Sequence, residues 1–98
     1  MEHQELLSGL VRLHILHHAV EGEVYRRWMI AELARHGYHL SPGTLYPMLH
    51  TMERRGDLTA RTERPVRRLC SATPMGREAL DLARRKVRGL FREMLPED

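Results

Sequence analysis

Histidines near the N-terminus are the residues of this 98-residue chain whose spacing is best suited to chemistry. His14 and His18 stand four positions apart, with His17 between them, and on a helix that spacing places two imidazoles on one face, as in a metal site. No carboxylate or cysteine continues the spacing, and the pair shares its face with Leu7 and Val11. We therefore predict that these histidines pack in an interface, and we expect neither a metal ion nor a cofactor.

Cys70, the single cysteine, is the other candidate for chemistry. Arg67 and Arg68 beside it would favour a thiolate and redox sensing, but a cysteine on a short strand is more often a small, half-buried packing residue, which we favour. A single cysteine also excludes an internal disulfide and is typical of the reducing cytoplasm, where we expect the protein to act.

Enzymatic motifs are missing from the sequence. It contains no catalytic acid pair, no phosphate-binding glycine loop and no nucleophile elbow, and Ser41 has no base placed beside it. No apolar run approaches the roughly 20 residues that cross a bilayer. We predict a protein that is not an enzyme and does not enter a membrane.

Arginine dominates the basic residues: Lys86 is the only lysine among 16 basic residues, and the net charge is +3. The guanidinium group is a planar fork that fits phosphate groups and base edges. The surplus lies in residues 41–73, which hold six arginines and three acidic residues. The six are Arg54, Arg55, Arg61, Arg64, Arg67 and Arg68. A local basic surplus of this kind favours a nucleic-acid partner.

Three helices are predicted in the first half of the chain. Apolar spacing indicates helices over residues 3–20 and 25–36, the second followed by Gly37, and a third helix that Gly56 ends. The third helix has apolar residues at i, i+3, i+4 and i+7, which are Leu45, Met48, Leu49 and Met52. Its outward residues are then Tyr46, Pro47, His50, Thr51 and Arg54. Because proline is costly deep inside a helix, this helix either begins near Thr44 or bends at Pro47.

A hairpin and a last helix follow. Residues 57–73 alternate polar and apolar side chains around Arg64-Pro65, which predicts two strands, and Thr73-Pro74 predicts the capped start of a helix that runs to about Leu95. Its apolar residues step by three and four as in a heptad seam, and the first helix is apolar on two faces, so both favour burial against a second subunit. The predicted dimer interface comprises Leu7, Val11, His14, His18, Leu80, Ala83, Val87, Leu90, Phe91 and Met94.

This order of elements is typical of a winged helix-turn-helix, whose third helix enters the major groove of DNA. We predict a mainly α fold with a small β-hairpin (α+β), in which residues 1–73 form the DNA-binding domain and residues 74–98 a dimerisation helix. A helix N-terminus suits a phosphate, and the basic hairpin suits the DNA backbone. The residues predicted for these contacts are Ser41, the Gly43 N–H, Thr44, Arg64 and Arg67. The alternative is a winged-helix protein-interaction dimer without DNA binding.

The segment LSPGTLYPMLH (residues 40–50), followed by MERRG (52–56), closely resembles the recognition-helix signature of the PadR family of transcriptional regulators. TPMGREAL (73–80) resembles the start of the last helix in the short branch of that family. The resemblance implies a homodimeric repressor, often of a transporter or detoxification operon, that a small molecule releases from DNA. By position, the family's phosphate contacts match Ser41, Thr44 and Tyr46, and the base-reading face carries His50, Thr51 and Arg54.

Two departures from the family bear on what the chain binds. The family commonly has Tyr-Gly-Tyr before the second helix, where this chain has YRR (residues 25–27). Some members hold planar drugs against a tryptophan in the last helix, where this chain has only Phe91. We expect Trp28 to pack in the core, and keep as an alternative an effector pocket of Trp28, His14 and Phe91 between the first helix and the partner's last helix.

Overall fold

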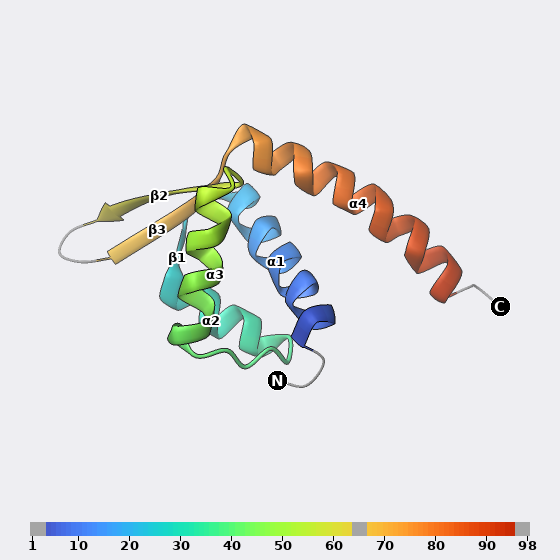
Figure 1. The fold of residues 1–98 in the computed structure, drawn as a ribbon, viewed down its shortest axis with the longest axis horizontal. Coiled ribbons are helices and arrows are strands. Elements are labelled where there is room, and N and C mark those ends of the chain that lie inside the picture. The colour runs from blue at the N-terminus through green and yellow to red at the C-terminus, as the bar shows by residue number, and fades with distance from the viewer. Residues whose placement is uncertain (1–3, 64–66, 96–98) are drawn as a thin grey trace.

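The computed structural model describes residues 4–63 and 67–95 of the chain (Figure 1). Within them the elements follow in the order α1 (Gln4–Glu21), β1 (Val24–Tyr25), α2 (Arg26–Arg35), α3 (Pro42–Arg54), β2 (Leu58–Glu63), β3 (Arg67–Ala72) and α4 (Pro74–Met94). The predicted mainly helical fold with a small antiparallel sheet is confirmed. Arg64, a predicted wing contact, lies outside the described residues. None of the described helices is both long enough and apolar enough to cross a membrane.

The sheet is antiparallel with the strand order β1-β3-β2. The hairpin of β2 and β3, which forms the wing, is paired from Leu58 opposite Ala72 to Glu63 opposite Arg67. Val24 of β1 pairs with Cys70 on the other edge of β3. This third strand corrects the expectation of a helix over residues 25–36, because Tyr25 ends β1 and α2 begins one residue later.

One hydrophobic core lies between α1, α2, α3 and the sheet, and the start of α4 closes it. Its buried members are Val11, Ile15, Leu16, Ala19, Met29, Leu33, Leu45, Leu49, Met52, Leu58, Cys70 and Leu80. Val11 is 0% exposed and Leu80 is 4% exposed, so both pack in the chain's own core. An apolar stripe shows that a helix face is covered, but not which chain covers it.

The recognition helix α3 begins earlier than the sequence predicted. Ser41 is its N-cap residue, and the Ser41 carbonyl accepts hydrogen bonds from the N–H groups of Thr44 (3.1 Å) and Leu45 (2.9 Å). The first turn therefore starts at Pro42, where the missing N–H of proline costs nothing. Pro47 consequently lies inside the helix.

Two junctions fix the end of α3 and the start of α4, as predicted. Gly56 has a φ of +90°, and the next residue, Asp57, donates its N–H to the Met52 carbonyl at 3.0 Å, which closes α3 with a Schellman motif. The Thr73 hydroxyl accepts a hydrogen bond from the Gly76 N–H at 3.0 Å and so caps α4. The same hydroxyl donates to the Gly56 carbonyl, so the two junctions are joined.

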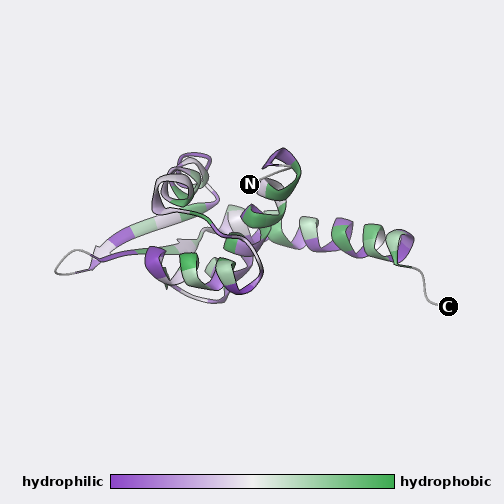
Figure 2. Ribbon diagram, turned by 90° about the horizontal axis from the view of Figure 1, so that it is seen from below, coloured by the Kyte–Doolittle hydropathy of each residue, from purple (hydrophilic) through white to green (hydrophobic). Residues whose placement is uncertain are grey.

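Helix α4 leaves the body of the molecule on the side opposite the wing (Figure 1). Its start packs on α1, but the remainder is exposed. The exposed fraction is 46% for Val87, 55% for Leu90, 59% for Phe91 and 65% for Met94. Hydrophobic positions recur along this stretch (Figure 2). Most of the predicted heptad seam is thus uncovered by the described part of the chain.

Candidate nucleic-acid interface

The outward surface of α3 carries the predicted base-reading residues. His50 and Arg54 are exposed and Thr51 is half-buried. The Thr51 hydroxyl donates to the Pro47 carbonyl (3.0 Å) and accepts a hydrogen bond from the Arg54 guanidinium (3.4 Å). The structure therefore places these three side chains on one helix, with the Arg54 side chain lying against it.

The N-terminus of α3 carries the predicted phosphate contacts Ser41, Gly43 and Thr44, all exposed. The Ser41 hydroxyl donates to the Thr44 hydroxyl oxygen at 3.3 Å. The Gly43 N–H makes no hydrogen bond within residues 4–63 and 67–95, as is usual in the first turn of a helix. Because the Thr44 N–H is bonded to the Ser41 carbonyl, the Gly43 N–H is the amide left open to an anion.

Tyr46 does not point into solvent as the periodicity predicted. It is half-buried against the core, and the guanidinium carbon of Arg26 lies 4.1 Å from the centre of its ring, a cation–π contact. The start of α2 covers this side of α3, which the spacing within α3 does not reveal. Tyr46 thereby forms part of the wall of a hollow of about 400 Å³.

This hollow, the basic hollow, lies between the start of α2, α3 and the wing strand β3. Its lining residues are Tyr25, Arg26, Arg27, Trp28, Tyr46, Arg67 and Arg68. Arg68 donates to Glu53 at 3.2 Å. Within the described residues, Arg26, Arg27 and Arg67 make no ion pair. Three guanidinium groups beside the recognition helix are therefore available to an anionic partner.

Arg26 and Arg27, which line this hollow, were not predicted as site residues, because in the sequence they stood only as a departure from the family pattern. The available signal was two adjacent arginines at the start of the helix that precedes the recognition helix. Conversely, Arg61, one of the six arginines in residues 41–73, is neutralised by Glu23, to which it donates two hydrogen bonds of 2.6 and 2.9 Å. These hydrogen bonds lower the pKa of Glu23. The wing is therefore less basic than its sequence indicates.

Trp28 is not a core residue, and that prediction is wrong. It is 44% exposed, lines the basic hollow, and packs edge-to-face with the His18 ring at 5.2 Å between centroids. The alternative effector pocket also joined Trp28 to His14 and Phe91, but within one chain His14 lines a different hollow and Phe91 lines neither. One chain alone therefore does not assemble that pocket.

Cys70 is more deeply buried than the expected half-buried strand residue. Its exposed fraction is 2%, and it lies on β3 opposite Val24. Burial, with a smaller contribution from Glu53, raises the pKa of the thiol. Since the thiolate is the reactive form, this environment opposes redox chemistry and agrees with a packing role.

A groove of about 280 Å³ separates α1 from α4. It is lined by Leu10, Leu13, His14, His17, Leu80, Ala83, Arg84 and Val87. The other residues predicted for a dimer interface on α1, Leu7 and His18, are half-buried. The groove includes Val87 of the exposed stretch of α4, and most of its lining residues are apolar.

A cluster of histidines and carboxylates, the histidine cluster, joins the end of α1 to α2. Its members are His14, His17, His18, Glu21, Glu32 and His36. The expectation that no carboxylate completes the histidine spacing is wrong, because both Glu21 and Glu32 lie within 4 Å of a histidine ring nitrogen. Burial, with repulsion from neighbouring imidazoles, lowers the pKa of His14 and His18.

Glu32 is the buried charged residue of the described chain, at 9% exposure. Arg35 donates two hydrogen bonds to its carboxylate, at 2.9 and 3.1 Å, and a His36 ring nitrogen lies 3.2 Å away. The hydrogen bond from Arg35 outweighs burial and, with the smaller contribution of His36, lowers the pKa of Glu32 to about 2. A lasting negative charge therefore lies beside the His18 ring.

The three-helix body, the hairpin beside α3 and the exposed polar surface of α3 define a winged helix-turn-helix protein. The profile of the family described as "Transcriptional regulator PadR-like family" matches residues 15–82. The chain belongs to this family of transcriptional regulators, as the resemblance of its recognition helix predicted.

Similar proteins agree with this assignment. The chain is 48% identical over 95 residues to "Transcriptional regulator Rv3488" of Mycobacterium tuberculosis (strain ATCC 25618 / H37Rv), covering 94% of this chain and 89% of that protein. Its fold is similar to a PadR-like transcriptional regulator from Bacillus cereus strain ATCC 14579, with a TM-score of 0.76, 24% identity, and 96% and 99% of the two chains covered. A transcriptional regulator from Clostridium thermocellum gives a TM-score of 0.75 at 17% identity, with 99% and 100% covered.

Proposed function

We propose that this protein is a homodimeric, sequence-specific DNA-binding repressor that acts in the cytoplasm. In this proposal residues 1–73 bind double-stranded DNA and residues 74–98 hold the dimer together. The observation that carries it is the exposed polar surface of α3 directly beside the basic hollow, whose Arg26, Arg27 and Arg67 make no ion pair with the described residues and suit a phosphate backbone.

The contacts divide into two kinds, which make different predictions. His50, Thr51 and Arg54 are the candidates for reading base edges in the major groove. The candidates for binding the DNA phosphate backbone lie at two places. These are Ser41, the Gly43 N–H and Thr44 at the N-terminus of α3, and Arg26, Arg27, Tyr46 and Arg67 around the basic hollow. Backbone contacts fix the position of the protein on DNA but carry no sequence information directly.

The exposed seam of α4 and the groove between α1 and α4 support a dimer. Val87, Leu90, Phe91 and Met94 form an apolar surface that water would otherwise contact, and burying such surface drives association. A two-fold dimer that reads successive major grooves requires a pseudo-palindromic operator, with half-sites one or two turns of about 10 bp apart. Control of a transporter or detoxification operon and release by a small molecule complete the proposal and rest on the family resemblance.

The test is binding to duplex DNA from the region upstream of the protein's own gene, measured by fluorescence anisotropy at several salt concentrations. Arg54→Ala is expected to weaken the free energy of DNA binding by about 1–3 kcal/mol and to relax the sequence preference, because a base contact is lost. Arg26→Ala is expected to weaken binding to all DNA sequences alike. It should also reduce the slope of log K against log salt by about 1, because one phosphate contact is lost.

Arg92→Ala is the matched control, since Arg92 is exposed in the last turn of α4, far from the wing. It should bind like the unmodified protein. Equal affinity for the upstream duplex and a scrambled duplex would refute sequence-specific binding, and no binding to either would favour the protein-interaction dimer.

A further inference from the structure

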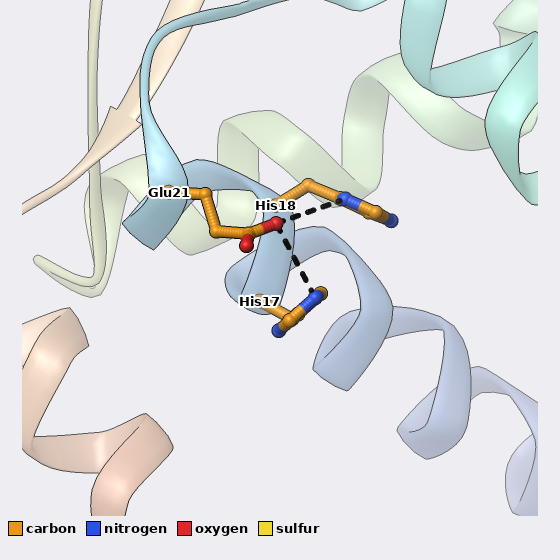
Figure 3. Close-up of side chains that lie close together, drawn as sticks. All are labelled: His17, His18 and Glu21. Carbon is orange, nitrogen blue, oxygen red and sulfur yellow. Dashed lines mark ion pairs between the residues drawn. The ribbon is translucent and has the colours of Figure 1, made fainter.

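Three side chains, His17, His18 and Glu21, converge at the C-terminal end of α1 (Figure 3). His17 Nε2 lies 3.4 Å from Glu21 Oε1, and His18 Nδ1 lies 3.9 Å from the same oxygen. The three ligand atoms all lie within 4.8 Å of one another. Figure 3 shows the Glu21 carboxylate between the two imidazole rings.

These separations are close to those of ligands on one metal ion. Two ligand atoms at about 2.0–2.1 Å from a tetrahedral ion are about 3.3 Å apart, so the separations within the set need to shorten by at most about 1.5 Å. The side chains of His17 and Glu21 are 44% and 64% exposed and have room to make this adjustment. The third side chain, His18, is 15% exposed and provides the fixed point.

The second ring nitrogen of His18, Nε2, lies beside a carboxylate that can orient the ring when Nδ1 binds a metal ion. His18 Nε2 is buried and makes no hydrogen bond within the described residues, although Glu32 Oε2 lies only 3.4 Å away. A metal ion on Nδ1 would leave the ring proton on Nε2, and a small turn of the ring would then let it donate to this carboxylate. Ligating histidines are usually oriented in this way by a carboxylate on the opposite ring nitrogen.

We propose that His17, His18 and Glu21 bind a divalent transition-metal ion of the zinc type, with Glu32 as the positioning residue for the His18 ring. Two imidazoles and one carboxylate match the nitrogen and oxygen donors that zinc prefers, and a solvent-exposed fourth position takes water. Because Arg35 and His36 hold Glu32, its carboxylate is anchored independently of the metal. The proposal does not depend on DNA binding.

Arg84 is the group that opposes the metal. Its Nη2 lies 3.4 Å from His17 Nδ1, to which it donates in this structure, so the His17 proton is on Nε2. Metal binding at Nε2 moves that proton to Nδ1 and breaks this hydrogen bond. The Arg84 side chain is 50% exposed and lies 3.9 Å from Asp81, toward which it can turn. Arg84→Ala is therefore expected to bind the metal several-fold more tightly.

The experiment titrates the full chain with zinc chloride by isothermal calorimetry and with cobalt(II), whose visible absorption reports the ligand geometry. The expected result is one ion per chain. Removing a ligand by Glu21→Gln should weaken zinc binding at least about 10-fold, and Glu32→Gln should weaken it about 10- to 100-fold, as for other outer carboxylates. Glu32→Asp, which keeps the charge, should recover part of the loss.

His39→Gln is the control, because His39 is exposed and lies outside the histidine cluster. Circular dichroism shows whether each variant is folded at the temperature of the titration. Glu21→Gln changes only an exposed side chain, so we expect this variant to fold. Zinc affinity that is unchanged in Glu21→Gln would overturn the proposal. Binding that Glu32→Gln abolishes but Glu21→Gln does not affect would also overturn it, since the ion would then lie on the other side of His18.

Discussion

Gly76 in the first turn of α4 is the position where a single methyl group should do most damage. A Cβ there would overlap the backbone carbonyl oxygen of Asp57, and it would lie 3.1 Å from the Asp57 carbonyl carbon and 3.3 Å from Leu16 Cδ1. The Asp57 carbonyl also accepts a hydrogen bond from the Thr73 N–H at 3.1 Å. The substitution Gly76→Ala must therefore displace the junction that joins α3 to α4.

The magnitude follows from one stabilising and two destabilising effects. Alanine in place of glycine in a helix stabilises it by about 0.5–1 kcal/mol. Overpacking costs about 1–3 kcal/mol. Weakening the Thr73–Asp57 hydrogen bond costs about 1 kcal/mol more. The steric effect is larger, and we expect the free energy of unfolding to fall by about 1–3 kcal/mol, which lowers the Tm of a chain this size by about 5–20 °C.

The assay is thermal unfolding followed by circular dichroism at one fixed protein concentration, because a dimer makes Tm depend on concentration. Gly89→Ala, in the same helix, is the matched control: its Cβ would meet nothing within 4 Å, so only the helix-propensity gain applies and Tm should rise. If Gly76→Ala also raises Tm, the close approach of Asp57 does not limit this position and the reasoning is refuted.

Three further predictions use other parts of the structure. Leu90→Asp puts a charge in the exposed seam of α4, so the sedimentation coefficient should change from that of a dimer to that of a monomer. A dimer that persists in this variant would show that the seam is not the dimer interface. Thr73→Val removes the cap of α4 at constant shape and should lower the free energy of unfolding by about 0.5–2 kcal/mol in urea titrations, whereas an unchanged midpoint would show that the cap contributes little. Cys70 should react with a thiol reagent only as fast as the protein unfolds, because burial raises the pKa of its thiol; fast labelling of the native protein would contradict this placement.

The features that the sequence predicted well are those whose causes are local. The apolar spacing of α3 places Leu45, Leu49 and Met52 in the core, as the pattern required. Gly56 ends that helix because glycine adopts a positive φ without the strain that a side chain would cause. Thr73 caps α4 because its hydroxyl reaches a free N–H. Each of these depends on residues fewer than eight positions apart.

The features that the sequence did not predict arise between distant segments. Strand β1 is two residues long and exists only because Val24 pairs with Cys70, so no alternation within it indicates a strand. Tyr46 is covered by Arg26 from another helix, and Glu32 becomes a partner of His18 only when α2 packs on α1. The family resemblance supplied the class of protein, but these contacts follow from the packing of this chain.

His17 belongs to both proposals, which makes them thermodynamically dependent on each other. It is a proposed zinc ligand, and it also lines the groove between α1 and α4 next to Arg84. Zinc binding would release Arg84 from His17 within the groove that is proposed to support the dimer. By linkage, the factor by which zinc changes the dimer dissociation constant must equal the factor by which dimerisation changes the zinc affinity. Zinc can shift the monomer–dimer equilibrium only if its binding changes contacts differently in the monomer and in the dimer. If the factor is one, Arg84 therefore moves without contacting the dimer interface.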